Sequence, residues 1–283
     1  MTDFKTISGR KIKFQTSDLT MSTATDGELF YSNTDSEFKI GIQVKAWSSG
    51  GNLNTTRNAL SGTGTLTAGL VAGGTSPGVA FETVAEEYDG SSWTNGGSIN
   101  TGRKLAATQG TQTAGIHTGG IKAPANTATG ETETYDGSSW TEVADLNQIR
   151  YGLGGAGTST AAVAFGGNEI GGSMQVASEE WGGSSWAEGD NLNTARHYVS
   201  GCGLQTAGLA IGGSLPPYTG ATEEYDGSSW TALPSLATAR YATAGAGTKT
   251  AGLAIAGRVS GGVVTAATEE FTAATTARSV DTT

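Results

Sequence analysis

The sequence predicts an all-β fold built from five copies of one small sheet, and three regular spacings predict it. Five tryptophans recur at intervals of 46, 47, 46 and 44 residues. An arginine stands ten residues after each tryptophan, and a Gly-Gly or Ala-Gly pair stands sixteen residues after each arginine. The tryptophans are Trp47, Trp93, Trp140, Trp186 and Trp230, and the arginines are Arg57, Arg103, Arg150, Arg196 and Arg240. Repeats of this length with short strand-like runs are typical of a propeller or a solenoid.

The first two strands of each unit are expected between the arginine and the glycine pair. The first strand is predicted from the arginine onward, as at 150–153, and a glycine-rich turn follows, as at 155–160. The second strands are predicted at Ala68–Ala72, Ala114–Thr118, Ala161–Phe165, Ala207–Ile211 and Ala251–Ile255. They alternate between a bulky apolar residue and glycine or alanine. This pattern suits a strand between neighbouring sheets, where overpacking costs about 1–3 kcal/mol.

The third and fourth strands form a hairpin in the prediction. The third strand ends in an acidic-aromatic box, as at 223–225, and an Asp-Gly pair follows in three of the units. Asp-Gly between strand-like runs is a strong hairpin signal, because the turn needs positive φ. The fourth strand then carries the tryptophan. Burying one indole contributes about 4–6 kcal/mol before entropy costs, so the tryptophans are expected to join the sheets.

The fifth unit lacks a fourth strand of its own. No tryptophan follows its acidic box at Phe271, and the unmatched tryptophan is Trp47, near the amino end. We therefore expect residues 39–49 to supply the outer strand of the last sheet and to close the ring, which leaves only short protected edges. An open solenoid is the alternative.

The unit resembles the Kelch repeat. The residues that carry the resemblance are the run Leu209–Gly213, the box Glu223–Asp226, Trp230 and the segment Leu236–Arg240. The short repeats, the terse Asp-Gly-Ser-Ser-Trp turn and the five units depart from the family's usual pattern. The resemblance implies a five-bladed Kelch-like β-propeller over residues 39–272. It implies no particular activity, because this fold hosts enzymes, adaptors and structural proteins.

Composition excludes several classes of partner. The formal net charge is −10 and no cluster of Lys and Arg is present, which argues against nucleic acid and anionic membranes. No apolar run approaches the roughly 20 residues of a membrane span. Cys202 is the single cysteine, so no internal disulfide is expected. We expect no cofactor and no metal.

Candidate binding residues lie between the second and third strands, where all the length variation falls. Binding residues concentrate on such loops over a rigid scaffold, although neutral drift in surface loops would give the same variation. The candidates are Phe81, Lys122, Met174, Pro217, Tyr218 and Arg258. The repeated arginines could bind anions, but ion pairs with the box glutamates are the preferred interpretation, which makes arginines and tryptophans structural.

Enzymatic chemistry is not expected. His117 and His197 are the only histidines, and with Cys202 and tyrosines they could resemble the copper site of galactose oxidase, itself a Kelch-type propeller. That site needs an added domain and ligands on specific loops, for which this chain shows no signature. The acidic residues repeat in every unit, whereas hydrolysis of sugars needs one pair of carboxylates in a cleft. We therefore predict no catalytic residues.

Residues 1–38 do not follow the repeat. A strand is predicted at Arg10–Gln15, and a hairpin with residues 33–36 at its tip is predicted at Gly27–Ile40. The hairpin resembles a Gly-Gln-Leu-Tyr-Tyr-Asn-Thr segment found in many bacteriophage tail-fibre and appendage proteins. The Gly-, Thr- and Ala-rich units also look like virion proteins of marine phages. A small subdomain packed on the disc is the alternative interpretation of residues 1–38.

The resemblance to virion proteins implies a function class. Residues 1–38 would dock on other virion proteins, 39–272 would be displayed outward, and 273–283 would form a tail. The expectation is a non-enzymatic tail-fibre, appendage or decoration subunit, made in the host cytoplasm and located in the virion. It would form a homo-oligomer or part of a larger assembly and attach to a host-surface glycan or receptor. The alternatives are a generic Kelch-type protein-binding scaffold and a carbohydrate-active or copper enzyme.

Overall fold

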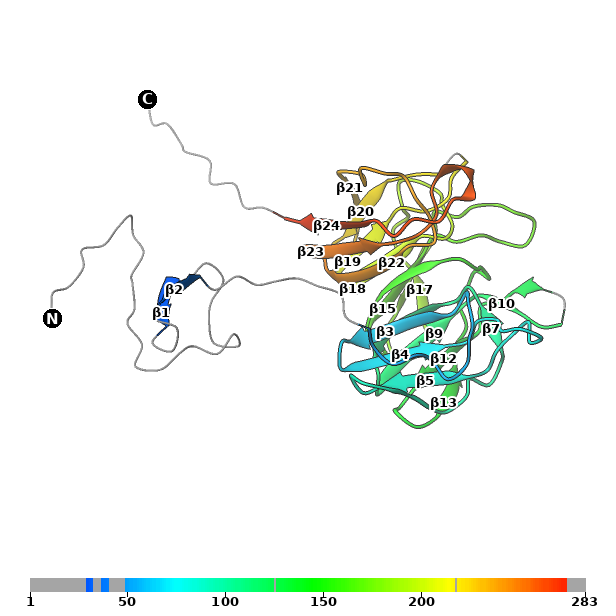
Figure 1. Cartoon of the computed structure of the whole chain (residues 1–283). Coiled ribbons are helices and arrows are strands. Elements are labelled where there is room, and N and C mark those ends of the chain that lie inside the picture. Colours follow the sequence, from blue (N-terminus) through cyan, green and yellow to red (C-terminus); the bar gives the residue numbers. More distant parts are fainter. Residues whose placement is uncertain (1–28, 33–36, 41–48, 125, 217, 274–283) are drawn as a thin grey trace, which may run out of the picture. The chain divides into compact units, whose positions relative to one another are not determined.

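The computed structural model describes residues 29–32, 37–40, 49–124, 126–216 and 218–273. The chain divides into two units, Met1–Ser49 and Gly50–Thr283. The described elements are antiparallel strands and one 3₁₀ turn, η1 (Ser260–Gly262), so the fold is all-β as predicted (Figure 1). In this described part of the chain, no helix has the length and apolar character needed to cross a membrane.

The first unit contains the predicted hairpin. Strand β1 (Leu29–Ser32) pairs with β2 (Glu37–Ile40) in a register that runs from Leu29↔Ile40 to Ser32↔Glu37. Its tip, the strand expected at Arg10–Gln15 and Trp47 lie outside the described residues. Lys39 and Ile40 lie in strand β2 of this hairpin, and residues 41–48 of the predicted outer strand lie outside the described residues.

The second unit contains six small sheets, five of which follow the repeat. The first sheet has β3 (Ser61–Thr65), β4 (Ala68–Ala72), β5 (Ala85–Tyr88) and β6 (Trp93–Asn95). The second has β8 (Ala107–Thr111), β9 (Ala114–Thr118), β12 (Thr132–Tyr135) and β13 (Trp140–Val143). The third has β14 (Gly154–Gly157), β15 (Ala162–Phe165), β16 (Ser178–Trp181) and β17 (Trp186–Glu188). The fourth has β18 (Ser200–Leu204), β19 (Ala207–Ile211), β20 (Thr222–Tyr225) and β21 (Trp230–Leu233).

The fifth sheet has three strands among the described residues, β22 (Ala244–Thr248), β23 (Ala251–Ile255) and β24 (Thr268–Thr272). The sixth is an addition to the second repeat that the sequence analysis did not predict. It joins β7 (Arg103–Lys104), β10 (Ile121–Lys122) and β11 (Thr127–Ala128). Its strands β10 and β11 lie between the second and third strands of that repeat, where the longest of the variable segments is found, and β7 precedes the first strand.

The first strand of each repeat begins later than the sequence suggested. The predicted strand at 150–153 is wrong, because β14 begins at Gly154, and the predicted turn at 155–160 overlaps it. The residue two positions after each arginine has positive φ, and three of these residues are Ala59 (53°), Leu105 (58°) and Tyr198 (50°). A left-handed residue interrupts an extended strand, so the regular strand starts two residues after it.

The Asp-Gly turns between the third and fourth strands form as predicted. Gly137 has a φ of 93°, a conformation that glycine adopts without steric cost. The Asp136 carboxylate accepts hydrogen bonds from the backbone N–H groups of Ser138 and Ser139 at 2.9 and 2.8 Å. These bonds hold the pKa of Asp136 below its usual range. The repeated turn motif is therefore structural.

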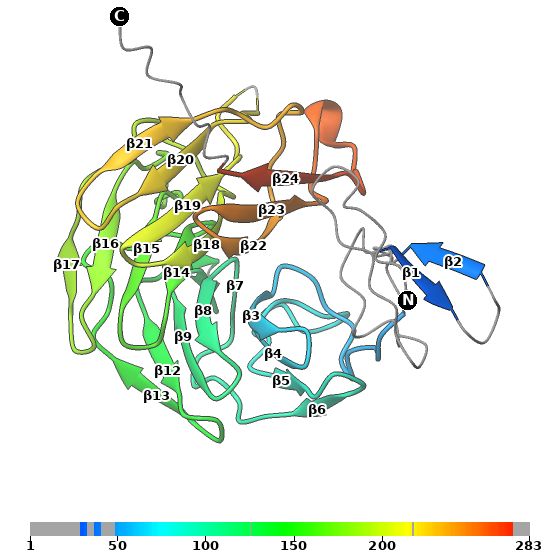
Figure 2. The same ribbon diagram turned by 90° about the vertical axis from the view of Figure 1, so that its left-hand side faces the viewer.

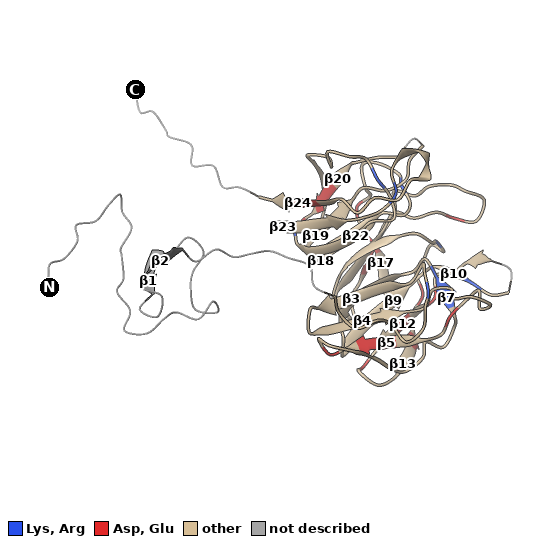
Figure 3. Ribbon diagram, in the orientation of Figure 1, with Lys and Arg blue, Asp and Glu red and all other residues tan. Residues whose placement is uncertain are grey.

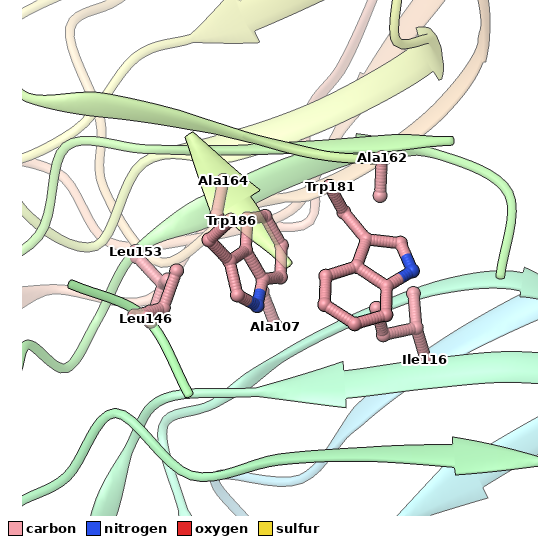
Figure 4. Packing of buried hydrophobic residues seen from close by; sticks show 8 residues of the cluster. All are labelled: Ala107, Ile116, Leu146, Leu153, Ala162, Ala164, Trp181 and Trp186. Carbon is pink, nitrogen blue, oxygen red and sulfur yellow. The ribbon is translucent and has the colours of Figure 1, made fainter. Parts of the chain in front are cut away.

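The core of each repeat lies between adjacent sheets. Trp186 on β17 packs with Trp181 of its own sheet, at a ring-centroid distance of 5.4 Å, and the cluster continues to the second sheet, where Ile116 lies beside Trp181 (Figure 4). Trp181 is 1% exposed and Ile116 fully buried. The tryptophans thus fill the space between neighbouring sheets, which is what the repeat spacing predicted.

The first strands of the five sheets lie side by side around one centre (Figure 2). Strand β3 packs on β8, β8 on β14, β14 on β18, and β18 on β22. Among the described residues, no contact of similar extent joins β22 to β3. Four junctions between neighbouring sheets are therefore extensive among the described residues.

Candidate functional site

The variable loops meet the residues just before each first strand at one end of the second unit. We call these residues, which run from the arginine to the first strand, the lead-ins. Isolated bridges pair the residue after the arginine with a residue just beyond the second strand: Asn58↔Thr75, Tyr151↔Asn168, His197↔Ser214 and Tyr241↔Arg258. The second repeat makes the same link through β7 and β10. We call this face the loop end. It corresponds to the face on which the sequence analysis placed the candidate binding residues.

The repeated arginines lie beneath the loop end, and each forms an ion pair there. Arg150 Nη2 lies 3.0 Å from Glu179 Oε1, and the two side chains are 0% and 1% exposed. The other Glu179 oxygen accepts hydrogen bonds from the Asn147 backbone N–H (2.7 Å) and side-chain amide (2.9 Å). Burial lowers the pKa of Arg150, and the charge of Glu179 opposes that shift. The matching pairs are Arg57–Glu86, Arg103–Glu133, Arg196–Glu223 and Arg240–Glu269. These ion pairs are those expected from the sequence, so the arginines do not form an open anion site.

An aromatic row crosses the loop end. The His197 and Tyr198 rings have centroids 4.5 Å apart, and Tyr198 and Tyr241 rings 5.8 Å apart. Tyr218 stacks on Tyr241 at 4.5 Å with an interplanar angle of 19°. All four rings are half-buried. The row therefore offers continuous aromatic surface with hydroxyl groups, from the fourth sheet to the fifth.

The predicted binding residues occupy separate parts of this face. Tyr218 stacks on Tyr241 in the aromatic row, and Arg258 forms a backbone bridge with the same Tyr241. Phe81 lies under the Lys104 ammonium, 5.1 Å from its ring centroid, and Lys122 forms an ion pair with Glu131. Met174 forms a bridge with Asn168, and Pro217 lies outside the described residues. The structure thus brings Tyr218 and Arg258 together and leaves Phe81, Lys122 and Met174 on other loops.

A ladder of backbone hydrogen bonds connects the sheets just inside the loop end. It joins the left-handed residues of successive repeats, each N–H donating to the carbonyl of the repeat before. The bonds are Leu105 to Ala59 (3.0 Å), Gly152 to Leu105 (2.9 Å), Tyr198 to Gly152 (2.6 Å) and Ala242 to Tyr198 (3.1 Å). Because a buried backbone group needs a partner, the ladder accounts for backbone geometry that local sequence does not favour.

A cavity of about 400 Å³ opens at the centre of this ladder. It is lined by the lead-ins and first strands of all five repeats, and Tyr198 stands at its rim. A second cavity of about 460 Å³ lies farther along the same strands. Gln109 lines both, is 4% exposed, and has no hydrogen-bond partner for either amide atom among the described residues. Gln109 therefore lies at the boundary between the two cavities.

The residues once considered for catalysis lie in structural settings. Burial lowers the pKa of His117 well below its usual value, and its Nδ1 lies 2.7 Å from the Thr108 hydroxyl. Cys202 is 8% exposed and packs with Leu209, and burial raises its pKa to about 11. Within the described ranges, no three His, Cys, Asp or Glu side chains gather closely enough to hold a metal ion.

Sequence reasoning missed Tyr198, Tyr241 and Gln109 as site residues. All three occupy positions that the repeat assigns to the scaffold. The signal was present at Gln109, because the same position holds Thr63, Ala156, Cys202 and Ala246 in the other repeats. A long polar side chain at a position otherwise held by small residues marks a local difference in function or packing.

Comparisons with known proteins leave the chain without a named family. Neither a scan of protein-family models nor a search of curated proteins gives a match.

Proposed function

We propose that the five repeated sheets are the blades of one β-propeller, and that residues just before Gly50 complete the fifth blade. The contacts between successive first strands and the backbone ladder support a ring. Gly50 supports the path of the chain. A Cβ on Gly50 would meet the Tyr88 hydroxyl at 2.8 Å, just as one on Gly96 would meet the Tyr135 hydroxyl at 2.8 Å. Gly96 follows the fourth-strand Trp93, so Gly50 takes the position expected after a fourth strand that contains Trp47.

An unfilled cavity in the fifth sheet supports the same proposal. Trp186 Nε1 donates to Thr132 Oγ1 at 3.2 Å, and Trp230 Nε1 donates to Ser178 Oγ at 2.9 Å. Each acceptor is the first residue of the third strand in the preceding sheet. The next such residue is Thr222, which lines a cavity of about 170 Å³ together with Leu236 and Phe271. This is where the pattern would place the Trp47 indole.

The function that the geometry supports best is non-enzymatic attachment, with this propeller displayed by a phage virion. The observation that carries it is the loop end itself. A scaffold whose repeated arginines are paired with glutamates presents a half-exposed aromatic row beside a central cavity. Small-molecule sites combine such apolar surface with a few polar groups. The pairing of β1 with β2 forms the hairpin on which the resemblance to tail-fibre and appendage proteins depends.

The experiment that tests this function uses virions that carry the full chain or a chain without residues 1–38. The full chain is expected in purified particles, detected by mass spectrometry and immunogold labelling. Removal of residues 1–38 should abolish incorporation while the remaining protein stays folded by circular dichroism. Detection of the full chain only in infected cells, and never in particles, would refute the virion assignment.

A protein-binding scaffold is the second candidate, and exposed apolar side chains on the variable loops favour it. Val79, Ile170, Val263 and Val264 are 45%, 59%, 60% and 71% exposed. Exposed apolar patches mark protein interaction sites, and Val263 and Val264 are adjacent in the loop of the fifth repeat. Replacing Val263 and Val264 with serine should weaken capture of a protein partner and leave glycan binding unchanged, whereas an attachment site at the aromatic row predicts that these two replacements have no effect on adsorption.

A further inference from the structure

The cavity at the loop end, lined by all five repeats, has the properties of a ligand site. We propose that it binds the neutral, hydroxyl-rich end of a saccharide and that the Gln109 amide holds it. The inference rests on the proposed attachment function and names the class of ligand. The volume of about 400 Å³ lies within the roughly 300–1,000 Å³ of typical small-molecule sites.

The lining of the cavity selects against charged ligands. None of its lining residues is Asp, Glu, Lys, Arg or His, and the first strands of the five sheets carry no charged residue (Figure 3). A charged group moved from water into such a site would lose hydration without gaining a partner. Phosphate, carboxylate and metal ligands are therefore disfavoured there, and an uncharged polar ligand fits.

The Gln109 amide supplies the polar contact. A buried donor or acceptor without a partner costs about 1–3 kcal/mol, and both Gln109 amide atoms lack one in the described structure. Two hydroxyl pairs in the same lining are already satisfied, Ser61 with Thr108 at 2.6 Å and Ser200 with Thr243 at 2.7 Å. A carboxamide offers one acceptor and two donors. Hydroxyl groups both donate and accept, so a sugar edge can satisfy both ends of this amide.

The neighbouring repeat leaves room for the amide. A Cβ on Gly155 would lie 1.8 Å from Gln109 Nε2, so any other residue at 155 would collide with this side chain. Glycine at this position and glutamine at 109 therefore fit together. The arrangement occurs once in the five repeats, at the junction of the second and third sheets, which gives the cavity a single polar anchor.

The aromatic rim supplies the apolar contact. Tyr198 is one of the residues that line the cavity, its ring lies beside that of Tyr241, and Tyr218 stacks on Tyr241. A tyrosine ring presents an apolar face and a polar tip. A sugar ring has the matching form, with an apolar C–H face and hydroxyl edges. A saccharide can therefore place its terminal unit against Gln109 and its next unit along the row.

The test measures binding of neutral and acidic sugars to the full chain. Glucose, galactose, mannose, N-acetylglucosamine and glucuronic acid are titrated by saturation-transfer NMR and calorimetry. At least one neutral sugar should bind, and Gln109→Ala should weaken it by about tenfold or more. Alanine occupies this position in the third and fifth repeats as Ala156 and Ala246, so the variant should fold. Gln112→Ala is the matched control, because its amide donates to the Gly69 and Tyr88 carbonyls instead, and it should bind normally.

The outcomes separate this inference from the attachment function. Equal sugar affinity in Gln109→Ala, stronger binding of glucuronic acid than of every neutral sugar, or no binding of any sugar tested would overturn the inference. Virions with wild-type and Gln109→Ala protein are then compared for adsorption to host cells. Equal adsorption would leave attachment standing and refute a role for the cavity. Neutral-sugar binding that depends on Gln109, without any contribution of the protein to adsorption, would keep the cavity site and refute attachment.

Discussion

The third and fifth sheets are built from the same repeated unit, yet the glutamate of the repeated ion pair is fully buried only in the third. The third sheet has four strands, and its Glu179 is 1% exposed in the ion pair with Arg150. The fifth has three described strands, and its Glu269 is 26% exposed in the pair with Arg240. Both ion-pair distances are 3.0 Å. The same local chemistry therefore forms in both sheets, but burial depends on the fourth strand and its tryptophan.

The junction between the fifth and first sheets also affects burial in the first sheet. Trp93 of that sheet is half-buried, whereas Trp140, Trp186 and Trp230 are 5–6% exposed. The backbone ladder likewise has four described bonds, which run in succession from Ala59 in the first repeat to Ala242 in the fifth. Because a tryptophan is buried by the preceding sheet, the three described strands of the fifth sheet bury Trp93 only in part. The stability of each repeat therefore depends on its neighbours, as in other repeat folds.

The largest expected effect comes from removing a tryptophan. Trp186→Ala should destabilise the protein by about 3–5 kcal/mol, the usual cost of truncating a buried aromatic ring. Trp47→Ala should cost a similar amount if its indole fills the cavity beside Thr222. Denaturant unfolding followed by far-UV circular dichroism measures both. A change below about 0.5 kcal/mol for Trp47→Ala, typical of a surface position, would rule out closure through this residue.

The next largest loss of stability is expected when the arginine of a repeated ion pair is replaced. Arg150→Met leaves Glu179 buried without its partner, which costs about 3–5 kcal/mol. Arg240→Met leaves Glu269 without its partner. Glu269 is 26% exposed in the structure, and the proposed fourth strand of the fifth blade would cover it, so the loss should be similar. The two variants are compared by their unfolding midpoints. A loss of only about 1–3 kcal/mol for Arg240→Met would mean that water solvates Glu269, and hence that the fifth sheet is not covered.

Single hydrogen bonds donated by the indoles give a further test of the comparison between the third and fifth sheets. Ser178→Ala removes the acceptor of Trp230 Nε1 and should cost about 1 kcal/mol. Thr222→Val makes the equivalent change at the cavity of the fifth sheet. If closure is correct, it should destabilise the wild type but not Trp47→Ala, so that a double-mutant cycle gives a coupling energy. A coupling energy of zero would place the Trp47 indole elsewhere.

Most strands could be predicted from the sequence, because their side chains carry the repeat. The second strands at Ala68–Ala72 and Ala251–Ile255 have the predicted bounds, and β15 begins one residue late. The first strands were displaced because Ala59 and Leu105 adopt positive φ, which neither residue favours. Their backbone geometry is stabilised by hydrogen bonds to other repeats, and no local pattern reveals such bonds.

The candidate site was predictable only in part. Tyr218 and Arg258 stood out because they lie in the variable loops of the fourth and fifth repeats, between the second and third strands. Tyr198 and Tyr241 become part of the site through ring stacking between the fourth and fifth sheets, a contact between positions 43 residues apart. Such a contact depends on how the sheets pack, which a repeat alignment does not give.

The smallest expected effect is at the turn between the third and fourth strands, where the third sheet differs from the others. Gly182 stands where the fourth sheet has Asp226, and Ser184 and Ser185 follow it as in the Asp-containing turns. A Cβ at Gly182 would meet nothing within 4 Å. Gly182→Asp should therefore be accommodated and stabilise the protein by about 0.5–1 kcal/mol through reduced unfolded-state entropy.

The pH dependence of that gain identifies the carboxylate as its second source. Hydrogen bonds from Ser228 and Ser229 lower the pKa of Asp226 to about 2, against about 3.9 in an unfolded chain. A carboxylate with a lowered folded pKa stabilises the protein above the unfolded pKa, and this stabilisation is lost as the pH falls through the folded pKa. The advantage of Gly182→Asp over wild type should thus be largest at neutral pH and shrink between about pH 4 and pH 2. Gly182→Ala supplies the control, since it carries no carboxylate and any gain it gives should not change with pH. An advantage for Gly182→Asp that stays constant into acid would assign the whole effect to the backbone.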